Sequence, residues 1–303
     1  MKTNKLFIIA ALLGTVLAGC QKEKEIVPED NPGGPDATQS WKLKVKVTKG
    51  AETRALDLEG TTLNGFWENG EEVAVFFGGD RIGTLEVTNA QGVTADLEGD
   101  IPKTVNLEEG DELMLLFPGR ADDKWTYANQ AGTIASIAAG FDYAKVTLTV
   151  TSVLDETLNV SVDDAVPFEA QQSVYGFSFK VGANPLQLKA FTLSSGVVGT
   201  GANFLVRDFA YGNNAWQPNY GVVSVTPAAT AAGPFYTAIR NDSGNNSATY
   251  SFLVVGNDDA LYAGEKANLP AKTFVNGKYF KATVSVSKKT FAPASGAQSF
   301  EVL

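Results

Sequence analysis

The sequence of 303 residues contains no histidine and a single cysteine, Cys20. Histidine is the commonest general base and the commonest metal ligand in proteins. Cysteine thiolates serve as covalent nucleophiles and as ligands of structural zinc. A lone cysteine also has no second thiol with which to form an internal disulfide. These absences argue against catalysis by histidine or a thiol, against a zinc site and against a disulfide-stapled fold.

Basic side chains are outnumbered as well. The chain has 24 lysines and arginines against 34 aspartates and glutamates, which gives a net charge of −10 and an isoelectric point near 4.7. Proteins that bind nucleic acid need a basic surface that displaces counterions from the phosphates. We therefore expect no nucleic-acid partner.

Carboxylates occur as neighbouring pairs, but their spacing does not indicate a catalytic site. A glycosidase needs two carboxylates about 5–9.5 Å apart across a cleft, whereas sequence neighbours on a strand point to opposite faces. The pairs lie in turn-like surroundings, at Glu71–Glu72, Glu108–Glu109, Asp122–Asp123, Asp163–Asp164 and Asp258–Asp259. We expect no enzyme activity, no catalytic residues, no metal site and no cofactor.

The first 19 residues have the pattern of a secretion signal. Lys2 and Lys5 precede the apolar run LFIIAALLGTVLAG, which is too short for a transmembrane helix with normal flanks. The run ends in LAGC, residues 17–20, and this resembles the lipobox of bacterial lipoproteins, in which the cysteine is alkylated by diacylglycerol. The resemblance implies lipidation of Cys20 and anchoring in outer-membrane lipid through its acyl chains. An ordinary signal peptide with a chance cysteine is the alternative.

Residues 20–40 are expected to form a lipidated flexible tether. The segment QKEKEIVPEDNPGGPDATQS is charged, rich in proline, glycine and aspartate, and has little to bury. Its r.m.s. span of roughly 25 Å would hold a domain clear of the lipid headgroups. Gln21 stands where an aspartate would indicate retention at the inner membrane, so we expect a surface-exposed protein of the outer membrane.

From Trp41 onward, apolar and polar residues alternate with a period of two, in segments rich in valine, threonine, phenylalanine and tyrosine. Only one segment, NQAGTIASIAAGFDY (residues 129–143), could form a brief helix. It could also form a strand within a loop. The pattern predicts an all-β chain of two β-sandwich domains, residues 41–168 and 169–303. The boundary is placed near Phe168, in the polar break SVDDAVPFEAQQ (residues 161–172).

The first predicted strand is the most regular. One face carries Trp41, Leu43, Val45 and Val47, and the opposite face carries Lys42, Lys44 and Lys46. A polar loop follows, in which Arg54 stands between Thr53 and Ala55.

Several motifs together resemble the fimbrillin and major fimbrial subunit superfamily of Bacteroidetes, which builds type V pili. Their matches span nearly the whole chain, although each is weak alone. They are the lipobox, a strand followed by KGAETRAL, FWENGEEVAVFF, DELMLLFPG, QSVYGFSFKV, LQLKAFTLSS and NGKYFKATVSVSKK. Family members usually carry Gly-Asp after the tryptophan turn, where this chain has Gly70 and Glu71.

The resemblance implies two tandem transthyretin-like β-sandwiches in a structural or tip subunit of a type V fimbria that acts in cell adhesion. In that family an arginine-specific protease cuts the loop after the first strand, and Arg54–Ala55 occupies the matching position. Removal of the strand that bears Trp41, Leu43, Val45 and Val47 would open a groove for a strand of another subunit. The outer lysines would keep the edge of the uncut precursor from pairing early. A permanent edge strand with an uncut Arg54 is the alternative.

The C-terminal tail TFAPASGAQSFEVL, residues 290–303, is a candidate donor strand because Phe300 and Val302 share one face at a free terminus. It could equally close its own sandwich. The expected partners are other fimbrial subunits, the protease, membrane lipid and a host or bacterial surface ligand.

A second functional class also fits the anchor and the tandem sandwiches, namely an outer-membrane glycan-binding lipoprotein of a polysaccharide-uptake system. Five loop aromatics could stack on sugar rings or could cover a core, and these are Trp125, Tyr127, Tyr211, Trp216 and Tyr220.

Overall fold

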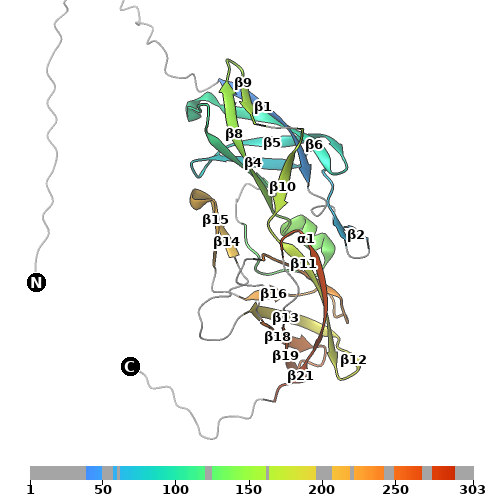
Figure 1. Cartoon of the computed structure of the whole chain (residues 1–303). Coiled ribbons are helices and arrows are strands. Elements are labelled where there is room, and N and C mark those ends of the chain that lie inside the picture. Colours follow the sequence, from blue (N-terminus) through green and yellow to red (C-terminus); the bar gives the residue numbers. More distant parts are fainter. Residues whose placement is uncertain are drawn as a thin grey trace, which may run out of the picture. The chain divides into compact units, whose positions relative to one another are not determined.

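The computed structural model describes residues 39–49, 57–59, 62–119, 125–161, 164–195, 207–218, 222–241, 249–267 and 275–290. Their regular secondary structure is almost entirely β-strand, with one short α-helix (Figure 1). The predicted all-β class is confirmed. Its division into two tandem transthyretin-like domains remains a prediction.

The first large sheet has eight strands in the order β10-β1-β6-β5-β4-β7-β8-β9. Additional pairings of β10 with β8 and of β1 with β9 close it into a barrel-like sandwich. Its strands are β1 (Ser40–Lys49), β4 (Glu72–Phe77), β5 (Asp80–Gln91), β6 (Thr94–Pro102), β7 (Glu112–Phe117), β8 (Ala144–Val153), β9 (Thr157–Val160) and β10 (Val166–Ala170).

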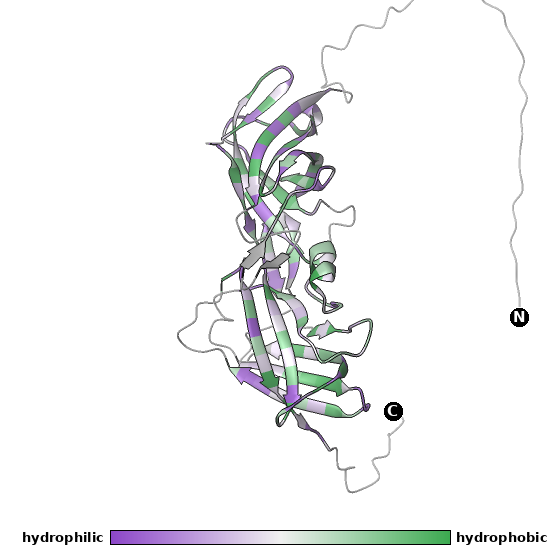
Figure 2. Cartoon of the chain, turned by 90° about the vertical axis from the view of Figure 1, so that its right-hand side faces the viewer, coloured by the Kyte–Doolittle hydropathy of each residue, from purple (hydrophilic) through white to green (hydrophobic). Residues whose placement is uncertain are grey.

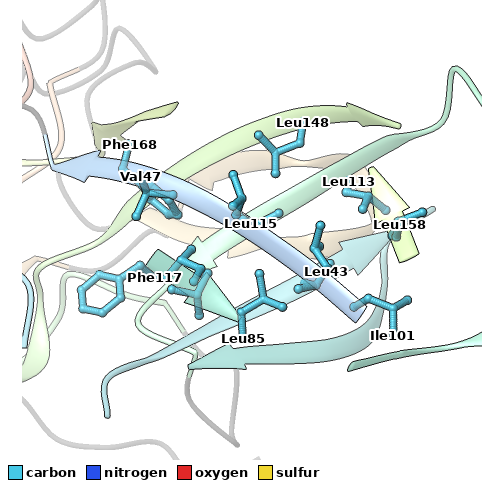
Figure 3. Close-up of a cluster of buried hydrophobic side chains, with 14 of the residues drawn as sticks. Leu43, Val47, Leu85, Ile101, Leu113, Leu115, Phe117, Leu148, Leu158 and Phe168 are labelled. Atoms are coloured by element: carbon cyan, nitrogen blue, oxygen red, sulfur yellow. The ribbon is translucent and has the colours of Figure 1, made fainter. Parts of the chain in front are cut away.

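One apolar core fills this closed sheet. Side chains along a strand point alternately to the two faces of the sheet, and some strands in Figure 2 show alternating hydrophobic and hydrophilic residues. Figure 3 shows β1 crossing over the buried cluster. Among its members are Leu43, Val47, Leu85, Ile101, Leu113, Leu115, Phe117, Leu148, Leu158 and Phe168.

The remaining large strands form two further sheets. In one of them, β11 lies between β17 and β20 and also pairs with β12, and the other has the order β16-β13-β18-β19-β21. Their bounds are β11 (Ser173–Val181), β12 (Asn184–Pro185), β13 (Leu188–Ser195), β16 (Val223–Val225), β17 (Phe235–Ile239), β18 (Thr249–Gly256), β19 (Leu261–Ala267), β20 (Tyr279–Ser285) and β21 (Ser287–Lys288). A second core, rich in aromatic residues such as Phe177, Phe191 and Phe252, lies among these strands.

Smaller elements complete the described chain. Strand pairs form between β2 (Asp57–Glu59) and β3 (Thr62–Asn64), and between β14 (Arg207–Ala210) and β15 (Ala215–Pro218). Short 3-10 turns occupy Lys103–Val105 and Tyr211–Asn213. The segment that could have been helix or strand contains the helix α1 (Ile134–Gly140), which Thr133 and Ser136 cap reciprocally.

Two interpretations of the sequence need correction. The polar break at residues 161–172 contains a strand, β10, whose Phe168 belongs to the first core. The first strand is not at an edge, because β1 pairs with β6 on one side and with β9 and β10 on the other. Long-range pairing with short strands decided both points, and such pairing leaves no periodic signal in the sequence.

Candidate functional site

The four apolar side chains of β1 are buried as predicted. Trp41, Leu43, Val45 and Val47 are each at most 7% exposed and all belong to the first core. Gly99 on β6 lies opposite Leu43 and packs so closely that an added Cβ would come 2.4 Å from the carbonyl oxygen of Thr84. Strand β1 therefore contributes a continuous row of side chains to the interior of the barrel.

The two sides of β1 are paired very differently. Toward β6, the pairing is antiparallel and continuous from Ser40 to Thr48. Toward the other side, β1 makes only two short parallel pairings, at Lys42–Leu43 with β9 and at Val47–Lys49 with β10. Among the described strands, none pairs with residues 44–46 on that side. We call this discontinuous boundary of β1 with β9 and β10 the β1 seam.

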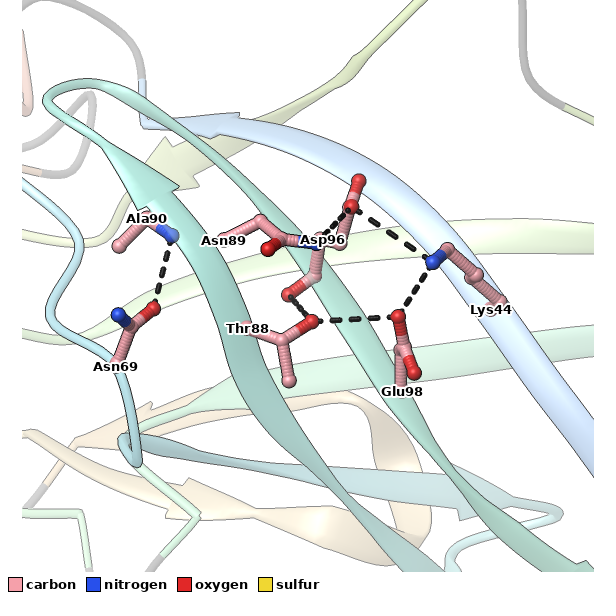
Figure 4. A network of polar contacts seen from close by, with 7 residues as sticks. All are labelled: Lys44, Asn69, Thr88, Asn89, Ala90, Asp96 and Glu98. Carbon is pink, nitrogen blue, oxygen red and sulfur yellow. Dashed lines mark hydrogen bonds and ion pairs between the residues drawn. The ribbon is translucent and has the colours of Figure 1, made fainter.

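Ion pairs on the outer surface join β1 to β6. The Lys42 ammonium lies 2.7 Å from a carboxylate oxygen of Asp100, and the Lys44 ammonium contacts both Asp96 and Glu98 (Figure 4). The hydrogen bond from Lys42 lowers the pKa of Asp100, and the hydrogen bond to Glu98 raises the pKa of Lys44. Strand β1 has neighbours on both sides and is not an edge strand, although residues 44–46 have no partner on the β9–β10 side among the described strands. The positive charges of these lysines complement the carboxylates of β6.

The last residue of β1, Lys49, is a buried cation. Its side chain has no exposed surface, and its ammonium lies 3.7 Å from the ring centroid of Trp67 and 4.5 Å from that of Phe117. The same group donates hydrogen bonds to the carbonyl oxygen of Phe66 (2.9 Å) and to Oε2 of Glu71 (3.1 Å). We call this arrangement of Trp67, Phe117, Glu71 and the Phe66 carbonyl the Lys49 pocket.

A tight turn positions the carboxylate of the pocket. Gly70 has a φ of +86°, which glycine adopts without strain. The backbone N–H of Glu68 donates to Oε2 of Glu71 across this turn (3.1 Å). Phe117 and Phe168 both pack against Trp67 in T-shaped contacts. This turn thus supplies Trp67, Glu71 and the Phe66 carbonyl to the pocket, and β7 supplies Phe117.

Sequence reasoning missed Lys49 and the role of Glu71. One signal was available, because position 49 continues the inward-facing series 41, 43, 45 and 47. A lysine at such a position needs a partner for its buried charge. Glu71 is that partner.

The other predicted site residues lie outside the described residues. They are Cys20, Arg54, Ala55, Phe300 and Val302. Strand β1 ends at Lys49, and Arg54 follows five residues later in the sequence.

The loop aromatics favour the core interpretation over a sugar platform. Trp125 and Tyr127 are fully buried, and both stack on Trp216. The Tyr127 hydroxyl donates to the carbonyl of Gln171 (3.0 Å). Tyr211 stacks on Phe76, which leaves its ring face covered. Tyr220 lies outside the described residues.

Metal ligands and membrane-spanning helices can be judged in the part of the chain that the structure describes. No group of three or more acidic or cysteine side chains there is arranged to hold a metal ion. No helix in that part has the length and apolar character needed to cross a membrane.

No protein-family model matches the chain, and no curated protein matches its sequence. Among solved structures, it is similar to a candidate cell adhesion protein from Parabacteroides distasonis, with 10% identity and a TM-score of 0.37 over 78% of this chain and 82% of that one. The tip fimbrial protein Mfa3 from Porphyromonas gingivalis, solved with a C-terminal truncation, gives 8% identity and a TM-score of 0.34 over 82% and 98%. A candidate adhesin from Bacteroides ovatus is similar with 8% identity and a TM-score of 0.34, over 92% of this chain and 100% of that one. TM-scores and identities this low do not decide the function.

Proposed function

We propose that the protein is a structural or tip subunit of a type V fimbria, exported as a lipoprotein, assembled by protease-triggered strand exchange and acting in cell adhesion. The observation that carries this proposal is the construction of β1. It contributes four buried side chains to the core, yet one of its two sides is only discontinuously paired. The motif resemblance to fimbrial subunits supports the same reading.

Loss of β1 would leave a site that needs a replacement strand. Burying each of Trp41, Leu43, Val45 and Val47 contributes roughly 1.5–3 kcal/mol, and the sum is comparable with the net stability of a whole domain, about 5–15 kcal/mol. The backbone groups of β6 along nine residue positions would also lose their partners. An extended segment of another subunit can satisfy both requirements.

The trigger in this proposal is cleavage after Arg54. The experiment is to treat purified precursor with an arginine-specific protease and to follow assembly by size-exclusion chromatography and electron microscopy. The cleaved chain should form polymers, and Arg54→Ala should stay monomeric. Arg120→Ala is the matched control, because it removes an arginine elsewhere and should polymerise normally. Polymers from the Arg54→Ala precursor, or monomers after complete cleavage at Arg54, would refute strand release as the trigger.

The donor in this proposal is the C-terminal tail, with Phe300 and Val302 as its inward-facing residues. The same cleavage experiment on a chain lacking residues 290–303 tests this part separately. The truncated chain should be cut at the same rate and should remain monomeric. Equal polymerisation of the truncated chain would show that another segment is the donor.

Membrane attachment through Cys20 completes the proposal. Two or more acyl chains give stable anchoring, since each buried methylene contributes about 0.8 kcal/mol. Metabolic labelling with palmitate should mark the wild-type precursor and should not mark Cys20→Ala. Label on the variant would show that the lipid is attached elsewhere on this chain and would refute lipidation at Cys20. After processing, the subunit is expected in the fimbrium at the cell surface.

A further inference from the structure

The Lys49 pocket has a chemistry that strand exchange alone does not require. We propose that it is a lysine-binding site that recognises the strand lying against β6 and fixes the register of that strand. Recognition of β1 does not depend on strand exchange. Recognition of an incoming strand rests on the strand exchange proposed above. Its ligand class is an extended segment with four alternating apolar residues and a lysine two positions after the last of them.

Every wall of the pocket favours a cation over an apolar group. The faces of Trp67 and Phe117 attract positive charge through their ring quadrupoles. The Phe66 carbonyl and the Glu71 carboxylate both accept hydrogen bonds from the Lys49 ammonium. Since the lysine side chain has no exposed surface and Glu71 is 17% exposed, water has little access to replace these bonds. An uncharged side chain in the pocket would leave both acceptors without a donor from the strand.

The pocket also supplies information that the apolar pattern lacks. A strand with a period of two exposes its core face when it slips by one residue, but a slip of two residues returns apolar side chains to the core. One such slip would place Val47 against Glu71. The opposite slip would place the Lys49 ammonium where Val47 now lies, in the apolar core. Only the native register puts a lysine in the pocket and keeps the core free of charge.

A second segment of the chain meets the same rule. Residues 280–288, FKATVSVSK, match residues 41–49, WKLKVKVTK, at four of nine positions, and the final lysine is one of them. In the structure this second lysine, Lys288, is exposed and pairs with Asp258 at 3.1 Å. The tail segment SFEVL carries no lysine. As the proposed donor, the tail would therefore fill the apolar row and leave the pocket without an ammonium, so the pocket would favour β1 over the tail.

The first test leaves the chain uncut and does not depend on strand exchange. Amide hydrogen exchange of residues 41–49 is measured in the full-length chain for Lys49→Met and for Lys46→Met, a matched control on the exposed face of the same strand. We expect exchange about ten-fold faster for Lys49→Met and unchanged exchange for Lys46→Met. Unchanged protection in Lys49→Met would overturn the proposal.

The second test measures recognition directly and remains valid if Lys49→Met fails to fold. Fluorescent peptides WKLKVKVTK and FKATVSVSK, and versions with norleucine in place of the final lysine, are titrated onto full-length chain cleaved after Arg54. Norleucine keeps the carbon chain and removes the ammonium. Each norleucine peptide should bind about ten-fold more weakly than its lysine counterpart. Equal affinity within each pair would overturn the proposal.

The two tests separate failure of the inference from failure of the proposed function. If no peptide binds, including the one with the sequence of β1, strand exchange is refuted. The amide exchange result then shows, independently, whether the Lys49 pocket stabilises the pairing of β1 in the uncut chain.

Discussion

Strand β1 and the strand pair β20–β21 carry nearly the same pattern, yet they are used differently. In residues 41–49 all four apolar side chains are buried and the final Lys49 is enclosed by two rings and a carboxylate. In residues 280–288, Phe280 and Ala282 are only half-buried, while Val284 and Val286 are buried. The side chain of Lys288 is 57% exposed.

The difference teaches that the receiving surface, rather than the strand, decides what the pattern does. Strand β20 pairs in parallel with β11 along Tyr279–Ser285, and Lys288 of the following strand β21 donates to the exposed Asp258. Strand β1 runs antiparallel to β6 and ends against the Trp67 turn. The same nine-residue pattern can therefore serve as an ordinary strand or as the occupant of a selective site.

The largest expected effect concerns the apolar row of β1. Leu43→Ala should destabilise the chain by about 2–5 kcal/mol, because it leaves a cavity in a fully buried position. Phe280→Ala, in the matching strand, should destabilise the chain less than Leu43→Ala does, because the Phe280 ring is only half-buried. Denaturant unfolding of both variants measures this. A smaller effect for Leu43→Ala than for Phe280→Ala would break the comparison.

An intermediate effect is expected from the two final lysines. Lys49→Met should destabilise the chain by about 1–3 kcal/mol, because Glu71 and the Phe66 carbonyl lose a buried donor. Lys288→Met should leave the unfolding midpoint unchanged, because its ion pair with Asp258 is exposed. Matched denaturant melts of the two variants give the answer. Equal unfolding midpoints for the two variants would mean that Lys49 in its pocket stabilises the fold no more than Lys288 does in its exposed ion pair.

The smallest effect is a pH dependence shared by both strands. Hydrogen bonds from Lys42 and Lys288 lower the pKa of Asp100 and of Asp258, respectively. A carboxyl whose folded pKa is lowered stabilises the fold above its unfolded pKa, about 3.9, and this contribution is lost as the pH falls through the folded value. Unfolding midpoints between about pH 5 and pH 2 should therefore fall less steeply for Asp100→Asn than for the wild type. High salt should reduce the difference. An unchanged slope would remove Asp100 from the account.

Local pattern was enough to predict the class of fold and the inward face of β1, because a period of two dictates which side chains share a face. It was not enough for the neighbours of β1. The parallel contacts with β9 and β10 join residues more than 100 positions apart, as in the pairing of Val47 with Val166. The Lys49 pocket was missed for a related reason. Its walls come from a turn and from β7, so the burial of the lysine depends on the tertiary fold.

The central prediction is that β1 is absent from the mature subunit. Fimbriae sheared from the cell surface can be dissociated, and the subunit can be analysed by N-terminal sequencing and intact mass. The mature chain should begin at Ala55 and should lack residues 41–49 and any acyl chain. A mature subunit that begins at Cys20, carries lipid and retains Trp41–Lys49 would contradict this prediction.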